Sequence, residues 1–136
     1  MTTRSRYLAS YHASVGAITN VSQTFSTAQL GAVTSLTDAV NISTDLALNN
    51  NFSVTLGGNR TLDNPTNPGI AQSGSIFIIQ DATGSRTLSF GTYWKFAAGA
   101  GPTLSTAANA IDRLDYIAQT ATAIQSVVTL DIKTIV

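Results

Sequence analysis

Residues 114–133, Leu-Asp-Tyr-Ile-Ala-Gln-Thr-Ala-Thr-Ala-Ile-Gln-Ser-Val-Val-Thr-Leu-Asp-Ile-Lys, alternate apolar and polar side chains on both sides of Thr120-Ala-Thr122. An alternation at every second residue is typical of a strand with one buried face. The apolar positions on one face are Leu114, Tyr116 and Ala118 before the turn and Ile124, Val128, Leu130 and Ile132 after it. This stretch therefore predicts a long hairpin at the end of the chain.

The same period of two occurs upstream. In residues 51–56, Phe52, Val54 and Leu56 alternate with polar residues, which predicts a half-buried strand. The Gly57-Gly58-Asn59 stretch that follows is a turn signal, because these residues adopt a positive φ at little cost.

Residues 75–79, Ser-Ile-Phe-Ile-Ile, are apolar at four consecutive positions, a pattern of strands that are covered on both faces. Residues 86–90 alternate again, with Leu88 and Phe90 on one side, and the turn residues 81–85 lie between the two segments. We expect these two segments to form a hairpin. Seven or eight short strands separated by Gly, Pro and Asn predict an all-β domain over residues 33–136, with a β-sandwich or jelly-roll-like fold.

Residues 1–32 have no such alternation. Apolar residues recur there only every three to five positions, among many Ser, Thr, Gly and Ala. Such a segment cannot bury enough surface to fold alone, so we expect an extended N-terminal arm. Two alternatives stay open for it: a disordered terminus, or a partner-binding arm that uses Tyr7, Tyr11 and Phe25 as apolar anchors.

Charged residues make up 10% of the chain and its formal net charge is zero, whereas an ordinary soluble domain is about 25% charged. A surface with so few charges favours association between proteins. It lacks the basic stripe that phosphate binding requires, so nucleic acid is not an expected partner. No apolar run approaches the ~20 residues that span a bilayer, so we expect no membrane partner either.

Candidate catalytic groups are few. The chain has no Cys, every acidic residue is Asp, and His12 is the one histidine. Asp112 and Asp115 lie three apart, and in a strand such positions point to opposite faces, which argues against a catalytic carboxylate pair. We expect no enzymatic activity, no metal and no cofactor. Tyr93, Trp94 and Phe96 form either a glycan-binding platform or part of the core.

Several short motifs follow one another between residues 52 and 116. They are Phe52-Ser-Val-Thr-Leu-Gly-Gly-Asn-Arg-Thr-Leu62, Gln80-Asp-Ala-Thr-Gly-Ser-Arg-Thr-Leu-Ser-Phe-Gly91, Trp94-Lys-Phe96, Pro102-Thr-Leu104 and Ala108-Asn-Ala-Ile-Asp-Arg-Leu-Asp-Tyr116. Their order and spacing resemble a small β-domain of tailed-bacteriophage virion proteins. Similar domains occur in tail fibres, head fibres and capsid decoration proteins.

This resemblance implies a structural virion component that forms a homotrimer. Because the chain is short and begins with an arm, we interpret it as a capsid decoration (cement) protein. Such a protein would bind the major capsid protein on the outer surface of the capsid and stabilise its lattice. The alternative is a tail-fibre or spike module that recognises host receptor glycan, with Tyr93 and Trp94 as the predicted contacts.

Overall fold

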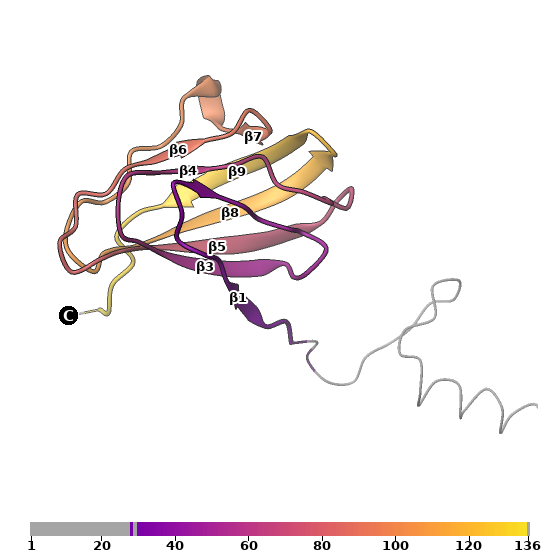
Figure 1. Ribbon diagram of the computed structural model, residues 1–136. Coiled ribbons are helices and arrows are strands. Elements are labelled where there is room, and N and C mark those ends of the chain that lie inside the picture. The colour runs from indigo at the N-terminus through magenta and orange to yellow at the C-terminus, as the bar shows by residue number, and fades with distance from the viewer. Residues whose placement is uncertain (1–27, 29, 136) are drawn as a thin grey trace, which may run out of the picture. The chain divides into compact units, whose positions relative to one another are not determined.

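The computed structural model describes Ala28 and residues 30–135. Contacts divide the chain between Leu30 and Gly31, and the second unit, Gly31–Val136, contains all of the described strands (Figure 1). In order, they are β1 (Val33–Ser35), β2 (Asn41–Ile42), β3 (Asn51–Leu56), β4 (Arg60–Leu62), β5 (Ser73–Gln80), β6 (Leu88–Phe90), β7 (Trp94–Lys95), β8 (Ile111–Thr120) and β9 (Ala123–Thr129). A single 3-10 turn, η1 (Ala97–Gly99), follows β7, and the all-β fold class is confirmed.

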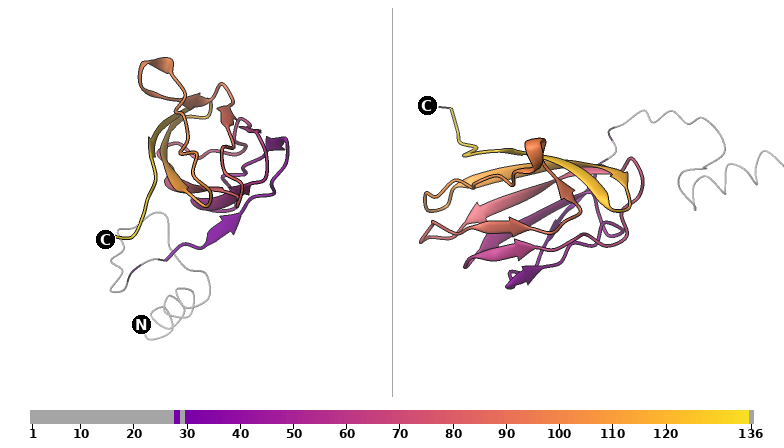
Figure 2. Two further views of the ribbon diagram at one scale, coloured as in Figure 1. Left: turned by 90° about the vertical axis from the view of Figure 1, so that its left-hand side faces the viewer. Right: turned by 90° about the horizontal axis from the view of Figure 1, so that it is seen from above.

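The strands form two sheets. The larger has the order β1-β3-β5-β8-β9-β7 and the smaller the order β2-β4-β6. From β1 to β6 the chain alternates between the sheets, and the strands within each sheet are parallel. The chain therefore winds through three successive coils, each with one strand in each sheet, and the end-on view of Figure 2 shows the coils surrounding the core.

The last two long strands are connected differently. β8 is antiparallel to β5, and β9 is antiparallel to β8. β7 then pairs with the free edge of β9 in parallel. The hairpin predicted for residues 114–132 is confirmed, although β9 ends at Thr129.

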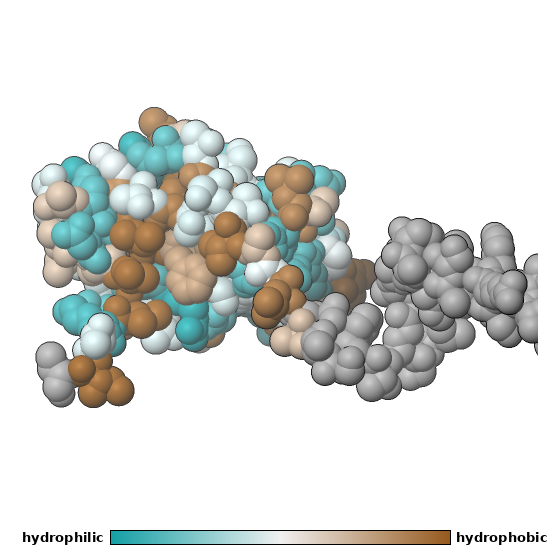
Figure 3. All heavy atoms as spheres, turned by 90° about the horizontal axis from the view of Figure 1, so that it is seen from below, coloured by the Kyte–Doolittle hydropathy of each residue, from teal (hydrophilic) through white to brown (hydrophobic). Residues whose placement is uncertain are grey.

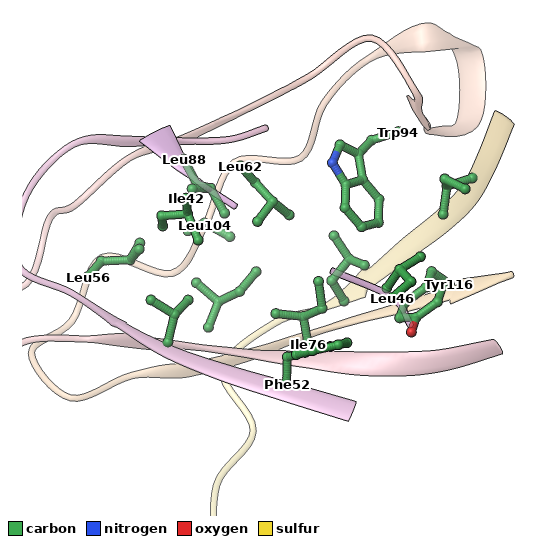
Figure 4. Packing of buried hydrophobic residues seen from close by; sticks show 14 of the residues in the cluster. Ile42, Leu46, Phe52, Leu56, Leu62, Ile76, Leu88, Trp94, Leu104 and Tyr116 are labelled. Atoms are coloured by element: carbon green, nitrogen blue, oxygen red, sulfur yellow. The ribbon is translucent and has the colours of Figure 1, made fainter. Parts of the chain in front are cut away.

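The core lies between the two sheets and is apolar. Phe52 and Ile76 enter it from the larger sheet, and Ile42, Leu62 and Leu88 enter it from the smaller sheet (Figure 4). Burying one such side chain stabilises the fold by roughly 1.5–3 kcal/mol. The alternation predicted for β3 is confirmed, because Phe52, Val54 and Leu56 are all buried.

The predicted hairpin of residues 75–79 with residues 86–90 is wrong. β5 lies in the larger sheet between β3 and β8, whereas β6 pairs with β4 in the smaller sheet. The buried side chain of Gln80, at the end of β5, stabilises the turn through which the chain passes from the larger sheet to the smaller one. Its Oε1 accepts a hydrogen bond from Arg86 N (2.8 Å), and its Nε2 donates to Arg86 O (2.9 Å). The amide thus satisfies the backbone that a strand partner would otherwise satisfy.

The β-sandwich or jelly-roll-like arrangement is not confirmed. Two sheets do enclose one core, but a jelly roll is built from antiparallel strands. Here β1 to β6 pair in parallel. No helix among the described residues is long and apolar enough to cross a membrane.

Candidate functional site

Trp94, one of the two residues predicted to contact glycan, belongs to the core. Its side chain is 4% exposed, and its indole Nε1 donates a hydrogen bond of 2.9 Å to the carbonyl oxygen of Asp63. The ring meets Tyr116 edge to face with the centroids 6.1 Å apart, and Figure 4 shows both among the buried residues. Stacking on a sugar requires an exposed ring face, so the structure assigns Trp94 to packing instead.

Tyr93, the second predicted glycan contact, is half-buried and lies on a firmly held backbone. Its N–H donates to Asn64 Oδ1 (2.8 Å), and its carbonyl oxygen accepts from Ile124 N (2.8 Å). Gly91, two residues earlier, is in contact with Asn64, where an added Cβ would lie 2.6 Å from the Asn64 nitrogen. The loop that carries Tyr93 is therefore fixed in place against the 63–64 loop.

An open depression of about 410 Å³ adjoins this loop. Two half-buried aromatic rings, Phe90 from β6 and Phe96 after β7, line it in a T-shaped pair with the centroids 4.7 Å apart. Ser89 and Thr92 line it as well, with the backbone of Gly99 and Gly101 in the loop that projects at the top of Figure 1. We call this the aromatic groove. No pattern in the sequence indicated the pairing of Phe90 with Phe96, because Phe90 ends β6 in the smaller sheet and Phe96 follows β7 of the larger sheet.

Asp112 and Asp115 point to opposite faces of β8, as the alternation predicted. Asp112 is buried, and its two oxygens accept hydrogen bonds from Ser105 N and Asp131 N, each at 2.8 Å. Asp115 lies on the outer side, where it pairs with Arg113 at 2.9 Å. The two carboxylates do not converge on a shared site, so they cannot form an acid–base pair for glycoside hydrolysis.

The predicted arm contacts Tyr7, Tyr11 and Phe25 lie outside the described residues, as does His12. Within Ala28 and residues 30–135, no group of three or more His, Cys, Asp or Glu side chains could hold a metal ion.

Comparison with known proteins identifies the family. Residues 33–119 match the family described as "putative phage tail fibre C-terminal domain". The chain belongs to this family. The match extends over more than half of the chain, from the start of β1 to the penultimate residue of β8. No curated protein and no solved structure gives a significant match.

The match to the tail fibre family shows that the chain is a small virion protein domain of a bacteriophage, which confirms the resemblance found in the sequence. It does not support the interpretation as a capsid decoration protein and agrees better with the tail-fibre alternative. The matched region includes both predicted glycan contacts and the whole aromatic groove.

Proposed function

We propose that this chain is a structural part of a phage tail fibre, works as a homotrimer, and contacts host-surface glycan through Tyr93 and the aromatic groove. The match to the tail fibre family carries this proposal. The expected location is therefore the tail instead of the capsid surface. The expected outer partner is a host polysaccharide instead of the major capsid protein. No catalytic step is part of it.

The aromatic groove has the chemistry that a sugar ring needs. A pyranose presents an apolar face of C–H groups and an edge of hydroxyl groups. Phe90 and Phe96 offer ring surface for the first, and the hydroxyls of Ser89 and Thr92 offer hydrogen bonds for the second. Glycine at positions 99 and 101 lets the loop backbone approach a ligand closely, because no side chain intervenes.

A homotrimer would suit this site. Binding of one sugar by a shallow, open depression is expected to be weak, and three linked sites convert later contacts into intramolecular events. The low charge of the chain favours association between copies.

The location is tested by immunogold electron microscopy of the intact phage with an antibody against residues 33–136. We expect label at the tail. Label spread over the head would overturn the tail-fibre assignment and restore the decoration interpretation.

Glycan binding is tested with lipopolysaccharide and capsular polysaccharide extracted from the strain on which the phage forms plaques. We expect the purified chain to bind one of them and to compete with phage adsorption. Tyr93→Ala and Phe96→Ala should each weaken binding about tenfold. Leu48→Ala, which shortens an exposed apolar side chain outside the groove, is the control and should bind as wild type. Equal binding by all the variants would place the glycan contact elsewhere.

A further inference from the structure

The larger sheet carries an unusual outer surface. Along β5, β8 and β9, alternate residues enter the core and the others point away from it. Outward positions of a solvated sheet are normally polar. Here, however, five of them are large and apolar: Phe77, Ile79, Ile111, Ile117 and Val127. We call these five residues, together with Arg113 and Asp115, the outer patch.

The outer patch is exposed in the single chain. Ile111, Ile117 and Val127 are 36%, 47% and 61% exposed, and Phe77 and Ile79 are half-buried. The space-filling view from below shows apolar side chains gathered on one face of the domain (Figure 3). The four consecutive apolar residues 76–79 belong to the stretch that predicted a strand covered on both sides. The core covers Ile76 and Ile78, whereas Phe77 and Ile79 are only half-buried by the residues that the structure describes.

The strand register makes the patch continuous. Ile79 pairs with Ile111 across β5 and β8, and Asp115 pairs with Val127 across β8 and β9. Ile117 is the diagonal neighbour of Val127, close enough for the side chains to touch. The smaller sheet differs, because its outward residues at the equivalent row are Asn41, Thr61 and Ser89.

The charges within the patch balance. Arg113 Nε bonds Asp115 Oδ1 at 2.9 Å, and Ser75 Oγ donates to the same oxygen at 2.6 Å. A second copy would therefore meet a neutral surface and would bury no unpaired charge. Among the described residues, Arg113 makes hydrogen bonds through Nε alone, so its two terminal nitrogens are available to carbonyl or carboxylate oxygens of a facing copy.

The area of the patch suits a small contact between copies. Its three strands, about 4.8 Å apart and about eight residues long at about 3.3 Å per residue, cover roughly 400 Å². Two such faces together bury about 800 Å², which is at the small end of protein interfaces and agrees with an assembly held by several such contacts.

We propose that the outer patch is the surface through which copies of this chain contact one another. This inference rests on the self-association in the proposed function and adds its location. Apolar area without net charge can pack against the same area of the neighbouring copies around the axis of a trimer, with Arg113 of each copy facing Asp115 of the next. A receptor glycan, by contrast, would need exposed hydrogen-bonding groups, and the patch offers few.

The test uses the full chain and compares Ile117→Lys/Val127→Lys with wild type by sedimentation equilibrium over a wide concentration range. We expect an oligomer for wild type and association about a hundredfold weaker for the double variant, because two lysines would be buried without partners. Val40→Lys is the matched control. Val40 is 73% exposed just before β2, in the smaller sheet, and its replacement should leave the oligomer intact.

The outcomes separate the two proposals. A double variant with wild-type circular dichroism that still forms the oligomer would overturn the outer patch and leave self-association standing. A wild-type chain that stays monomeric at every concentration would overturn both. Glycan binding by the aromatic groove is measured independently of either result.

A second measurement covers the case in which the double variant does not fold. The chain has no cysteine, so Val127→Cys and Val40→Cys each introduce a single thiol. A short bis-maleimide should crosslink the Val127→Cys chains into dimers and leave the Val40→Cys chains largely monomeric. Equal crosslinking of the two variants would contradict the proposal.

Discussion

The three coils of β1 to β6 and the hairpin of β8 and β9 bury side chains with the same two-residue period, yet they are connected in opposite ways. In the hairpin, Thr120 pairs with Ala123, so the partner strands are neighbours in the sequence. In the coils, Val33 pairs with Asn51 and Asn51 pairs with Ser75, which are 18 and 24 residues apart. The strand in between lies in the other sheet.

This difference separates local from nonlocal determinants of the fold. A hairpin is specified by its turn and by the alternation on either side of it. A parallel coil is specified by corners that direct the chain from one sheet to the other, and by contacts with the coils before and after it. In this chain the corners are held by side chains such as Gln80 and Asp38, the latter pairing with Arg60 at 2.7 Å.

The largest expected effect on stability is that of a substitution in the coils, Gly74→Ala. This residue lies on β5, where an added Cβ would overlap the carbonyl oxygen of Asn50, just before β3. The obstacle is backbone, which cannot rotate away, so Gly74→Ala should force the two coils apart. We expect a loss of about 3 kcal/mol or more in the free energy of unfolding, measured in urea.

Gly101→Ala is the control for that substitution. The nearest atom to its Cβ would be Phe90 Cδ2 at 3.5 Å, an ordinary contact. Its free energy of unfolding should stay within about 0.5 kcal/mol of wild type. Similar losses in the two variants would mean that the close approach at Gly74 is not the cause.

The next largest effect should come from the hairpin side, at Asp112. Asp112→Ala removes the acceptor of Ser105 N and Asp131 N and leaves both donors without it. We expect a loss of about 2–3 kcal/mol in urea unfolding, because hydrogen bonds to a charged group are strong and unpaired buried donors are costly. Hydrogen exchange at Asp131 should also become faster.

Asp115→Ala serves as the comparison on the opposite face of β8. It removes a partly exposed ion pair with Arg113, and such pairs contribute about 1 kcal/mol or less. If Asp115→Ala were the more damaging of the two, the structural role assigned to Asp112 would be wrong.

The smallest effect concerns the contact between the two regions. Tyr116 of the hairpin donates a hydrogen bond of 2.7 Å to the Asn50 carbonyl oxygen of the coils. Tyr116→Phe should cost about 1 kcal/mol at neutral pH. The cost of leaving the buried Asn50 carbonyl oxygen without this hydrogen bond does not depend on pH. Unfolding at alkaline pH therefore tests the burial of the phenol independently.

Burial raises the pKa of the Tyr116 hydroxyl to about 12, from about 10 in an unfolded chain. The neutral phenol is therefore favoured by folding. Its contribution to stability is complete below about pH 10 and is lost as the pH rises through about 12. Over this interval wild type should lose more stability than Tyr116→Phe. Parallel curves for the two proteins would contradict the assigned burial of the phenol.

The candidate site was predictable in part. The aromatic residues Tyr93, Trp94 and Phe96 stood out in the sequence, but the order of residues does not distinguish a buried indole from an exposed one. The Asp63 carbonyl that binds Trp94 is 31 residues away in the chain. Phe90 and Phe96 form one groove because β6 and β7 end near the same loop, which no local pattern records.

The sequence by itself determined the all-β class, the hairpin of β8 and β9, and the buried face of β3, because alternation and turn residues act over a few positions. Only the tertiary structure decided that β5 and β6 separate into two sheets, that Trp94 enters the core, and that Phe77 and Ile79 lie half-buried on the outer face of β5. These features depend on which distant strands become neighbours. That choice is made by the packing of the whole core, and no short stretch of sequence carries it.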